Sequence, residues 1–116
     1  MTGGTSDLFT AVAIACGHDL KVNEYNDRLT LQKGCYILNS WGYGPKYPFN
    51  MYIRGPYSSE LAGEYYKHRV ITRGKTDIPE DALSKLAEIY SKGIGYAEAY
   101  ATVLMIKTNS KDSSSE

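Results

Sequence analysis

The stretch RLTLQKGCYILNSWGYGPKYPFNMYIRGPYSSELAGEYY, residues 28–66, decides the fold of this 116-residue chain. Leu31, Cys35 and Leu38 follow the i, i+4, i+7 spacing of one helical face, and aromatic and aliphatic neighbours widen that stripe. The pattern predicts a helix over residues 28–41, stopped by the glycines and proline that follow it. A stripe this wide indicates a central helix that several other elements contact.

The second half of the stretch predicts a strand and then another helix. Residues 49–54 alternate apolar and polar between two proline-containing turns, which is typical of a strand with Phe49, Met51 and Ile53 facing the core. Ser58 follows Gly55-Pro56-Tyr57 and is a good N-cap for the next helix. The buried face of that helix is expected to contain Leu61, Ala62, Tyr65 and Tyr66.

The flanking sequence predicts three more helices and one short strand. We expect helices over residues 7–16, capped by Ser6 or Asp7, and over residues 96–107. Between them, Asp77 is expected to cap a helix whose apolar stripe ends at Tyr90. Residues 69–72 favour a strand that pairs with residues 49–54. The prediction is therefore a mainly α (α+β) fold, with about five helices around a central helix and a small two-stranded antiparallel sheet or wing.

Composition and charge indicate a single globular domain over residues 7–107. Its apolar fraction of 42% and charged fraction of 22% are ordinary for a globular protein. Residues 1–6 and 108–116 are polar and are expected to be flexible ends. The sequence contains neither a long apolar run nor a secretory signal pattern, so we expect a cytoplasmic protein without a membrane span.

Metal, cofactor and catalytic patterns are weak. Cys16, Cys35, His18 and His68 are the soft ligands, and they lack the paired spacing of a structural zinc site. We therefore expect reduced thiols, no metal and no cofactor. No nucleophile elbow or paired histidines occur, and the two carboxylates of residues 60 and 64 fit a solvated helix face better than acid–base work. The sequence does not predict an enzyme.

Two polar segments beside the apolar stripe have open interpretations. In one interpretation, Gln32 and Lys33 contact a partner or a phosphate. In the other, the Gln32 side chain hydrogen-bonds to backbone at the Gly-Pro turn and Lys33 is solvated. The second interpretation is the more common one for buried amides. Residues 55–58, with Arg54, either present helix amides to an anion or form a tight strand-to-helix turn. The turn is favoured because a P-loop pattern is missing.

Tyrosine is concentrated in the middle of the chain, with seven of the eleven tyrosines between residues 36 and 66. Some are expected in the core, namely Tyr36, Tyr65 and Tyr66. Those in turns or on the polar strand face are surface candidates, and with a neighbouring arginine they suit a protein interface or base stacking. The predicted interface consists of Tyr43, Tyr47, Tyr52, Arg54 and Tyr57.

The motifs L31-Q32-K33, Y36-I37-L38 and F49-x-x-Y52-x-x-G55-P56-Y57-S58-x-x-L61 resemble the YwgA-like family of uncharacterised prokaryotic proteins. They are more distantly similar to the Panacea (DUF4065) domain. The resemblance covers residues 25–107, and its motifs are specific together and weak singly. The YwgA-like resemblance implies no established activity, whereas the Panacea resemblance implies an antitoxin that neutralises a partner protein, or an adaptor; mobile-element and defence contexts are common for such proteins. Relatives carry further helices, so the chain resembles a shortened member.

Two functional hypotheses follow. The first is a small protein-interaction module, antitoxin-like or accessory to a mobile element, whose partner is another protein. The second is a winged-helix-like nucleic-acid-binding regulator, because residues 21–75 hold nine Lys/Arg and four Asp/Glu. In it the helix after Ser58 reads the groove and the following segment forms the wing, with contacts from Lys67, Arg69, Arg73 and Lys75. The sequence indicates neither the partner's identity nor an oligomeric state.

Overall fold

The computed structural model describes the backbone of residues 4–114 and the side chains of residues 4–108. Within this range the chain forms five helices and two short antiparallel sheets, which confirms the mainly α fold class. The helices are α1 Thr5–Cys16, α2 Tyr25–Ser40, α3 Ser59–Tyr65, α4 Glu80–Ser91 and α5 Ile94–Ser114. The strands are β1 Leu20–Lys21, β2 Asn50–Tyr52, β3 Gly55–Tyr57 and β4 Val70–Ile71.

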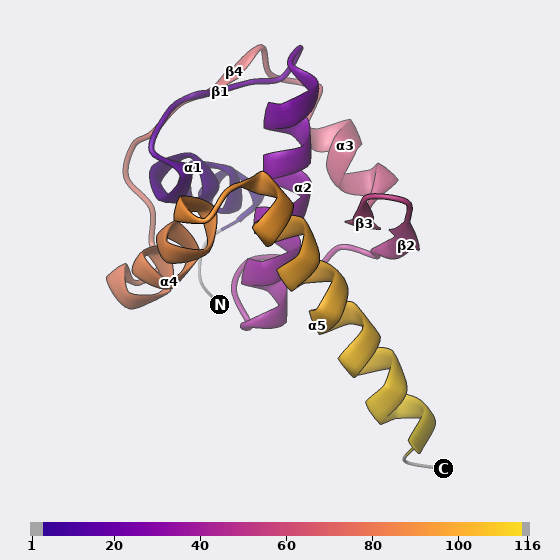
Figure 1. Ribbon diagram of the computed structural model, residues 1–116. Helices are drawn as coiled ribbons and strands as arrows, with labels where there is room; N and C mark the ends of the chain where they lie inside the picture. The colour runs from indigo at the N-terminus through magenta and orange to yellow at the C-terminus, as the bar shows by residue number, and fades with distance from the viewer. Residues whose placement is uncertain (1–3, 115–116) are drawn as a thin grey trace.

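Helix α2 is the centre of the molecule, as its wide stripe predicted. It packs against α1, α4 and α5, and also against β1 and β3 (Figure 1). Leu31, Cys35 and Leu38 are fully buried in this packing. Gly34 lies where α1, α2 and α4 approach most closely, because an added Cβ would come within 2.7 Å of a Val12 methyl group.

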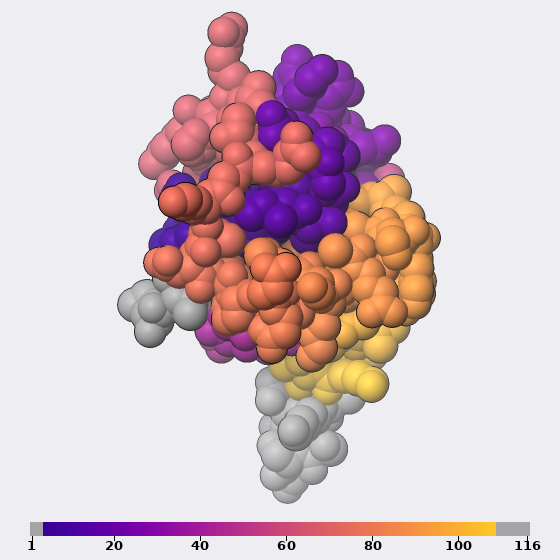
Figure 2. Space-filling view, turned by 90° about the vertical axis from the view of Figure 1, so that its left-hand side faces the viewer, coloured from indigo at the N-terminus to yellow at the C-terminus, as the bar shows by residue number. Residues whose placement is uncertain are grey.

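The remaining core is built from α1 and α4, which cover one side of α2. Figure 2 shows the face turned away from the β2–β3 hairpin, where α1 lies between the segment after β4 and helix α4. The Asp7 carboxylate accepts a hydrogen bond from the backbone N–H of Asp77 at 3.0 Å, and this bond lowers the Asp7 pKa. Asp7 therefore ties the start of α1 to the segment before α4.

Several predicted helix ends are wrong by a few residues. Helix α1 begins at Thr5 after Gly4 and has no side-chain cap, so neither Ser6 nor Asp7 caps it. Pro79, and not Asp77, is the N-cap of α4. Helix α2 begins three residues before the predicted start. At the other end of the chain, α5 continues through part of the predicted flexible tail to Ser114 and projects from the body (Figure 1). Residues 1–3 and 115–116 of the predicted ends lie outside the described residues.

The strand pairing also differs from the prediction. Residues 70–71 pair with β1, in the register Leu20↔Ile71, and not with residues 49–54. Strand β2 instead forms a hairpin with β3, in which Tyr52 pairs with Gly55. Gly55 follows the turn with a φ of +98°, a conformation that suits glycine. The hairpin stands out from the core, so Met51 is 41% exposed and Ile53 is fully exposed instead of facing inward.

Candidate functional site: a tyrosine pocket

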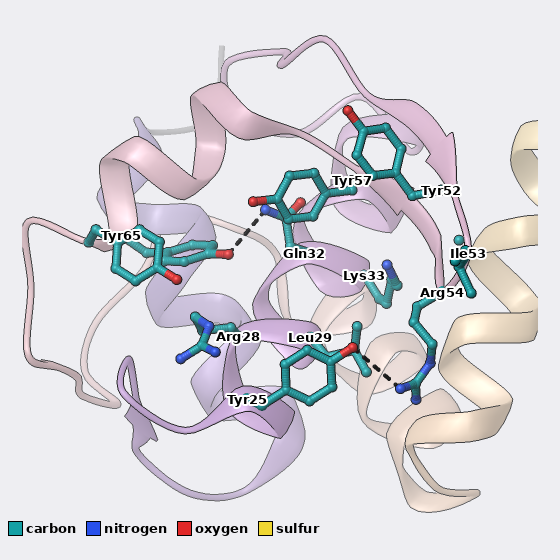
Figure 3. Close-up of a pocket in the computed structure, with 12 residues that line it drawn as sticks. Tyr25, Arg28, Leu29, Gln32, Lys33, Tyr52, Ile53, Arg54, Tyr57 and Tyr65 are labelled. Atoms are coloured by element: carbon teal, nitrogen blue, oxygen red, sulfur yellow. Dashed lines mark hydrogen bonds between the residues drawn. The ribbon is translucent and has the colours of Figure 1, made fainter.

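A pocket of about 520 Å3 opens between α2, the β2–β3 hairpin and the end of α3 (Figure 3). Helix α2 contributes one wall, the hairpin contributes the second, and the last turn of α3 contributes the third. We call it the tyrosine pocket. Its twelve lining residues are Tyr25, Arg28, Leu29, Gln32, Lys33, Tyr52, Ile53, Arg54, Gly55, Tyr57, Tyr65 and Tyr66.

Gln32 joins the walls together. Its amide nitrogen donates to the Ser58 carbonyl at 2.9 Å and to the Tyr65 hydroxyl at 3.2 Å, while its oxygen accepts from the Ser58 N–H at 2.9 Å. The Ser58 hydroxyl in turn accepts from the Leu61 N–H and caps α3, as predicted. Gln32 therefore has the predicted structural role at the Gly-Pro turn, and its hydrogen-bonding capacity is used inside the protein.

Lys33 contradicts the expectation of a solvated side chain. It is 1% exposed, and its ammonium donates to the Pro56 carbonyl at 2.7 Å. Burial lowers the pKa of Lys33 to about 8, although the nearby Glu98 carboxylate opposes this shift and Arg54 adds to it. The amine is therefore still mostly protonated at neutral pH. In Figure 3 its nitrogen lies between Gln32 and Arg54, in the middle of the pocket.

Arg54 holds the hairpin against α5. Its Nε lies 2.5 Å from Oε2 of Glu98, and one terminal nitrogen donates to the Tyr25 hydroxyl at 3.4 Å. This ion pair compensates a Glu98 oxygen that is buried without another partner among the described residues. Gly55 approaches α5 as well, since an added Cβ would lie 2.7 Å from the Thr102 hydroxyl.

Aromatic rings form the walls around these cations. The Tyr52 and Tyr57 rings are stacked, with centroids 5.2 Å apart and an interplanar angle of 27°. The Arg28 guanidinium lies over both the Tyr25 and Tyr66 rings, at 5.8 and 5.9 Å from their centroids. Such contacts hold the guanidinium in place while its unused donors stay available.

The predicted interface is divided by the structure into two parts. Tyr52, Arg54 and Tyr57 line the tyrosine pocket, whereas Tyr43 and Tyr47 do not. These last two are half-buried against the core, in a loop that follows α2.

Asn39, which the sequence analysis did not single out, organises that loop. Its side chain donates to the carbonyls of Tyr43 and Pro45 and accepts from the Tyr47 N–H. The Tyr47 hydroxyl also forms a hydrogen bond with Thr5. These contacts give the two tyrosines a packing role.

The remaining expectations for tyrosines and thiols are met unevenly. Tyr65 is buried, and burial raises its pKa to about 12. Tyr66, which was expected in the core, is 58% exposed at the pocket rim. Cys35 is buried and Cys16 half-buried; both are free thiols whose pKa burial raises. Raised pKa values keep thiols in the less reactive protonated form.

The basic segment predicted for nucleic acid does not form a wing on the hairpin. Arg73 is held by Asp19 and by the Gly17 carbonyl, and Lys67 pairs with Glu64. Arg69 and Lys75 are exposed. The outer side of α3 carries Glu60 and Glu64, whose negative charge is unfavourable beside phosphates.

The pocket residues that the sequence did not indicate are Tyr25, Arg28, Leu29, Ile53, Tyr65 and Tyr66, the last three of which were expected in the core. Tyr25 belongs to the first turn of α2 and lies before the predicted helix start at residue 28. The spacing Tyr25, Arg28, Gln32 is the signal available in the sequence, because residues three and four apart share a helix face.

Comparison with known proteins adds no assignment. No protein-family model, curated protein or solved structure matches the chain. Within the described range, no helix is both long and apolar enough to cross a membrane. Across that same range, no group of three His, Cys, Asp or Glu side chains is placed to hold a metal ion.

Proposed function

We propose that this protein is a protein-interaction module that engages another protein through the tyrosine pocket and the adjoining hairpin. One observation carries the proposal: a pocket walled by five tyrosines and two arginines continues onto an exposed apolar hairpin tip. Tyrosine and arginine are the residues that contribute most at interfaces. The resemblance to antitoxin-like and accessory proteins is compatible with this function, and a cytoplasmic setting is part of the proposal.

The hairpin tip favours a macromolecular partner over a small ligand. Ile53, which lines the pocket, is fully exposed, and Met51 of the same hairpin is 41% exposed. A small molecule inside the pocket would leave these side chains in water. A protein surface that enters the pocket would cover them as well, which is the usual role of an exposed apolar cluster with a polar rim.

The nucleic-acid hypothesis has less support. Two of its four cations are already paired, and the helix expected to enter a groove has an acidic outer face. Binding at low salt to duplex or single-stranded DNA, with a steep loss as salt rises, is the observation that would favour it.

The test is site-directed capture followed by quantitative binding. A photo-crosslinking amino acid at position 53 should capture a partner from host cells, whereas the same amino acid at position 92, which is exposed and does not line the pocket, should not. The purified partner should then bind Tyr57→Ala about thirtyfold more weakly than the unmodified protein, because hot-spot truncations cost about 2 kcal/mol or more.

Tyr96→Ala is the matched control, because Tyr96 is a partly exposed tyrosine on α5 that does not line the pocket. Its affinity for the partner should stay within twofold of the unmodified protein. Equal binding of the partner to Tyr52→Ala, Tyr57→Ala and the unmodified protein would remove the pocket from the interface.

A further inference from the structure

The buried ammonium of Lys33 has hydrogen-bonding capacity that the protein does not use. An ammonium carries three N–H donors, and the described residues provide one acceptor, the Pro56 carbonyl. In Gln32, its neighbour, both amide N–H donors are used by Ser58 and Tyr65, and the amide oxygen accepts from the Ser58 N–H. A buried ammonium with unused donors is unfavourable even with the Glu98 carboxylate nearby, and an acceptor arriving in the pocket would relieve that cost.

The charges around the pocket specify the sign of that acceptor. Its lining contains three cations, from Arg28, Lys33 and Arg54, and none of its twelve residues is acidic. Glu98, on α5, faces Arg54 and is already paired with it. The other titratable groups of the lining are five tyrosine hydroxyls. The pocket therefore retains an excess of positive charge in a partly enclosed, aromatic site.

The tyrosine walls of the pocket indicate which chemical groups lie next to the anion in the ligand. Stacked Tyr52 and Tyr57 on one side and exposed Tyr66 on the other offer flat apolar surfaces close to the cations. The apolar tip at Ile53 extends this surface beyond the pocket. A segment of chain that carries an acid between aromatic or aliphatic residues matches both the charge at the centre and the apolar rim.

We infer that the tyrosine pocket binds an acidic peptide segment of the partner protein, with one Asp or Glu carboxylate against the Lys33 ammonium and apolar neighbours on the tyrosines. This inference rests on the proposed function and adds the chemistry of the segment that is recognised. Lys33 supplies the charged contact at the bottom of the site, and Arg28 and Arg54 reinforce it from the sides.

The direct test uses peptides with acetylated and amidated ends. One set carries a single Glu between two aromatic residues, and the matched set carries Gln at the same place. The Glu peptides should bind at least tenfold more tightly, since a hydrogen bond to a charged group contributes about 1.5–3 kcal/mol. Lys33→Met should remove that preference, whereas Lys46→Met, at an exposed lysine of the loop after α2, should leave it unchanged.

Measuring peptide affinity against pH tests the same contact in the unmodified protein, so the result does not depend on whether a variant folds. Because the Lys33 pKa is about 8 and the complex is expected to raise it by one unit or more, Glu-peptide affinity should be constant well below pH 8 and fall by at least about eightfold at pH 9.5. The Gln peptide should be insensitive over this range, and it controls for deprotonation of the pocket tyrosines.

Three results would overturn the inference: equal binding of Glu and Gln peptides, a Glu preference that survives Lys33→Met, or benzoate alone binding as tightly as any Glu peptide. The last result would assign the pocket to small carboxylates. These failures are separable from failure of the proposed function. If the captured partner is lost by Tyr57→Ala but binds Lys33→Met normally, the interface stands and the acidic recognition is wrong.

Discussion

The two faces of helix α2 are built on different chemistry. One face carries Leu31, Cys35 and Leu38, which are fully buried against α1 and the neighbouring core. The other carries Gln32 and Lys33, which are equally buried but polar, and which connect α2 to the Gly-Pro turn. The apolar face stabilises the fold through burial alone. The polar face is stable only where each group finds a partner, and Lys33 finds one for a single donor.

The largest expected effect is on the apolar face. Leu31→Ala should lower the free energy of unfolding by about 3 kcal/mol, because a fully buried leucine leaves a cavity when it is truncated. Urea denaturation followed by circular dichroism measures this. A loss below about 1 kcal/mol would mean that this face of α2 is not packed as described.

On the polar face, Gln32→Leu should cost about 2 kcal/mol although the volume is nearly kept. The Ser58 N–H would lose its partner in a buried place, and the Ser58 carbonyl would keep only the bond from the Ala62 N–H. Tyr65→Phe is the matched control, because it removes only the third contact of Gln32, and it should cost about 1 kcal/mol or less. An equal loss of unfolding free energy in both variants would contradict the conclusion that Gln32 stabilises the turn through its bonds to Ser58.

The sequence predicted the apolar face well and the polar face in part. Helical periodicity identified Leu31, Cys35 and Leu38, and local capping chemistry identified Ser58, because both signals are contained within a few residues. Gln32 was expected to bond to backbone at the turn, and it does. Lys33 was expected in solvent because lysine is rarely buried, and only the non-local packing of the hairpin and α5 over it encloses the amine.

Strand pairing and strand facing were the least predictable parts. Residues 70–71 pair with Leu20–Lys21, a two-residue strand too short to show a periodic pattern. Apolar and polar residues do alternate over residues 49–54, but the hairpin stands away from the core. The alternation therefore did not indicate burial, and Met51 and Ile53 are exposed. Tyr43 and Tyr47, two of the five predicted interface residues, lie outside the tyrosine pocket, half-buried in the loop that the Asn39 side chain organises, and no local pattern indicates that contact.

An effect of about the same size depends on pH and involves the polar face alone. The folded Lys33 pKa of about 8 lies below the ordinary 10.5, so between these values the unfolded chain binds more protons than the folded one. Unfolding free energy should therefore rise by about 2 kcal/mol from pH 7 to 9.5 because of Lys33. The destabilisation is fully present below pH 8. The difference between the unmodified protein and Lys33→Met isolates this contribution from the tyrosines, and a flat difference would refute it.

The smallest effect is expected at the hairpin tip. Ile53→Ser should change the unfolding free energy by less than about 0.5 kcal/mol, because the side chain is fully exposed. The same variant should weaken binding of the captured partner. A large loss of stability, with partner binding retained, would show that the tip serves the fold and not the interface.

The most direct measurement is the pKa of Lys33 itself, followed by NMR through the chemical shift of its ε-carbon as pH is raised. We expect a pKa of about 8 in the free protein. The pKa should rise by at least one unit when the Glu peptide is added and should not rise with the Gln peptide, because a carboxylate favours the protonated amine. An ordinary value near 10.5 in the free protein, or a value that the Glu peptide leaves unchanged, would contradict a buried cation that receives an acidic segment.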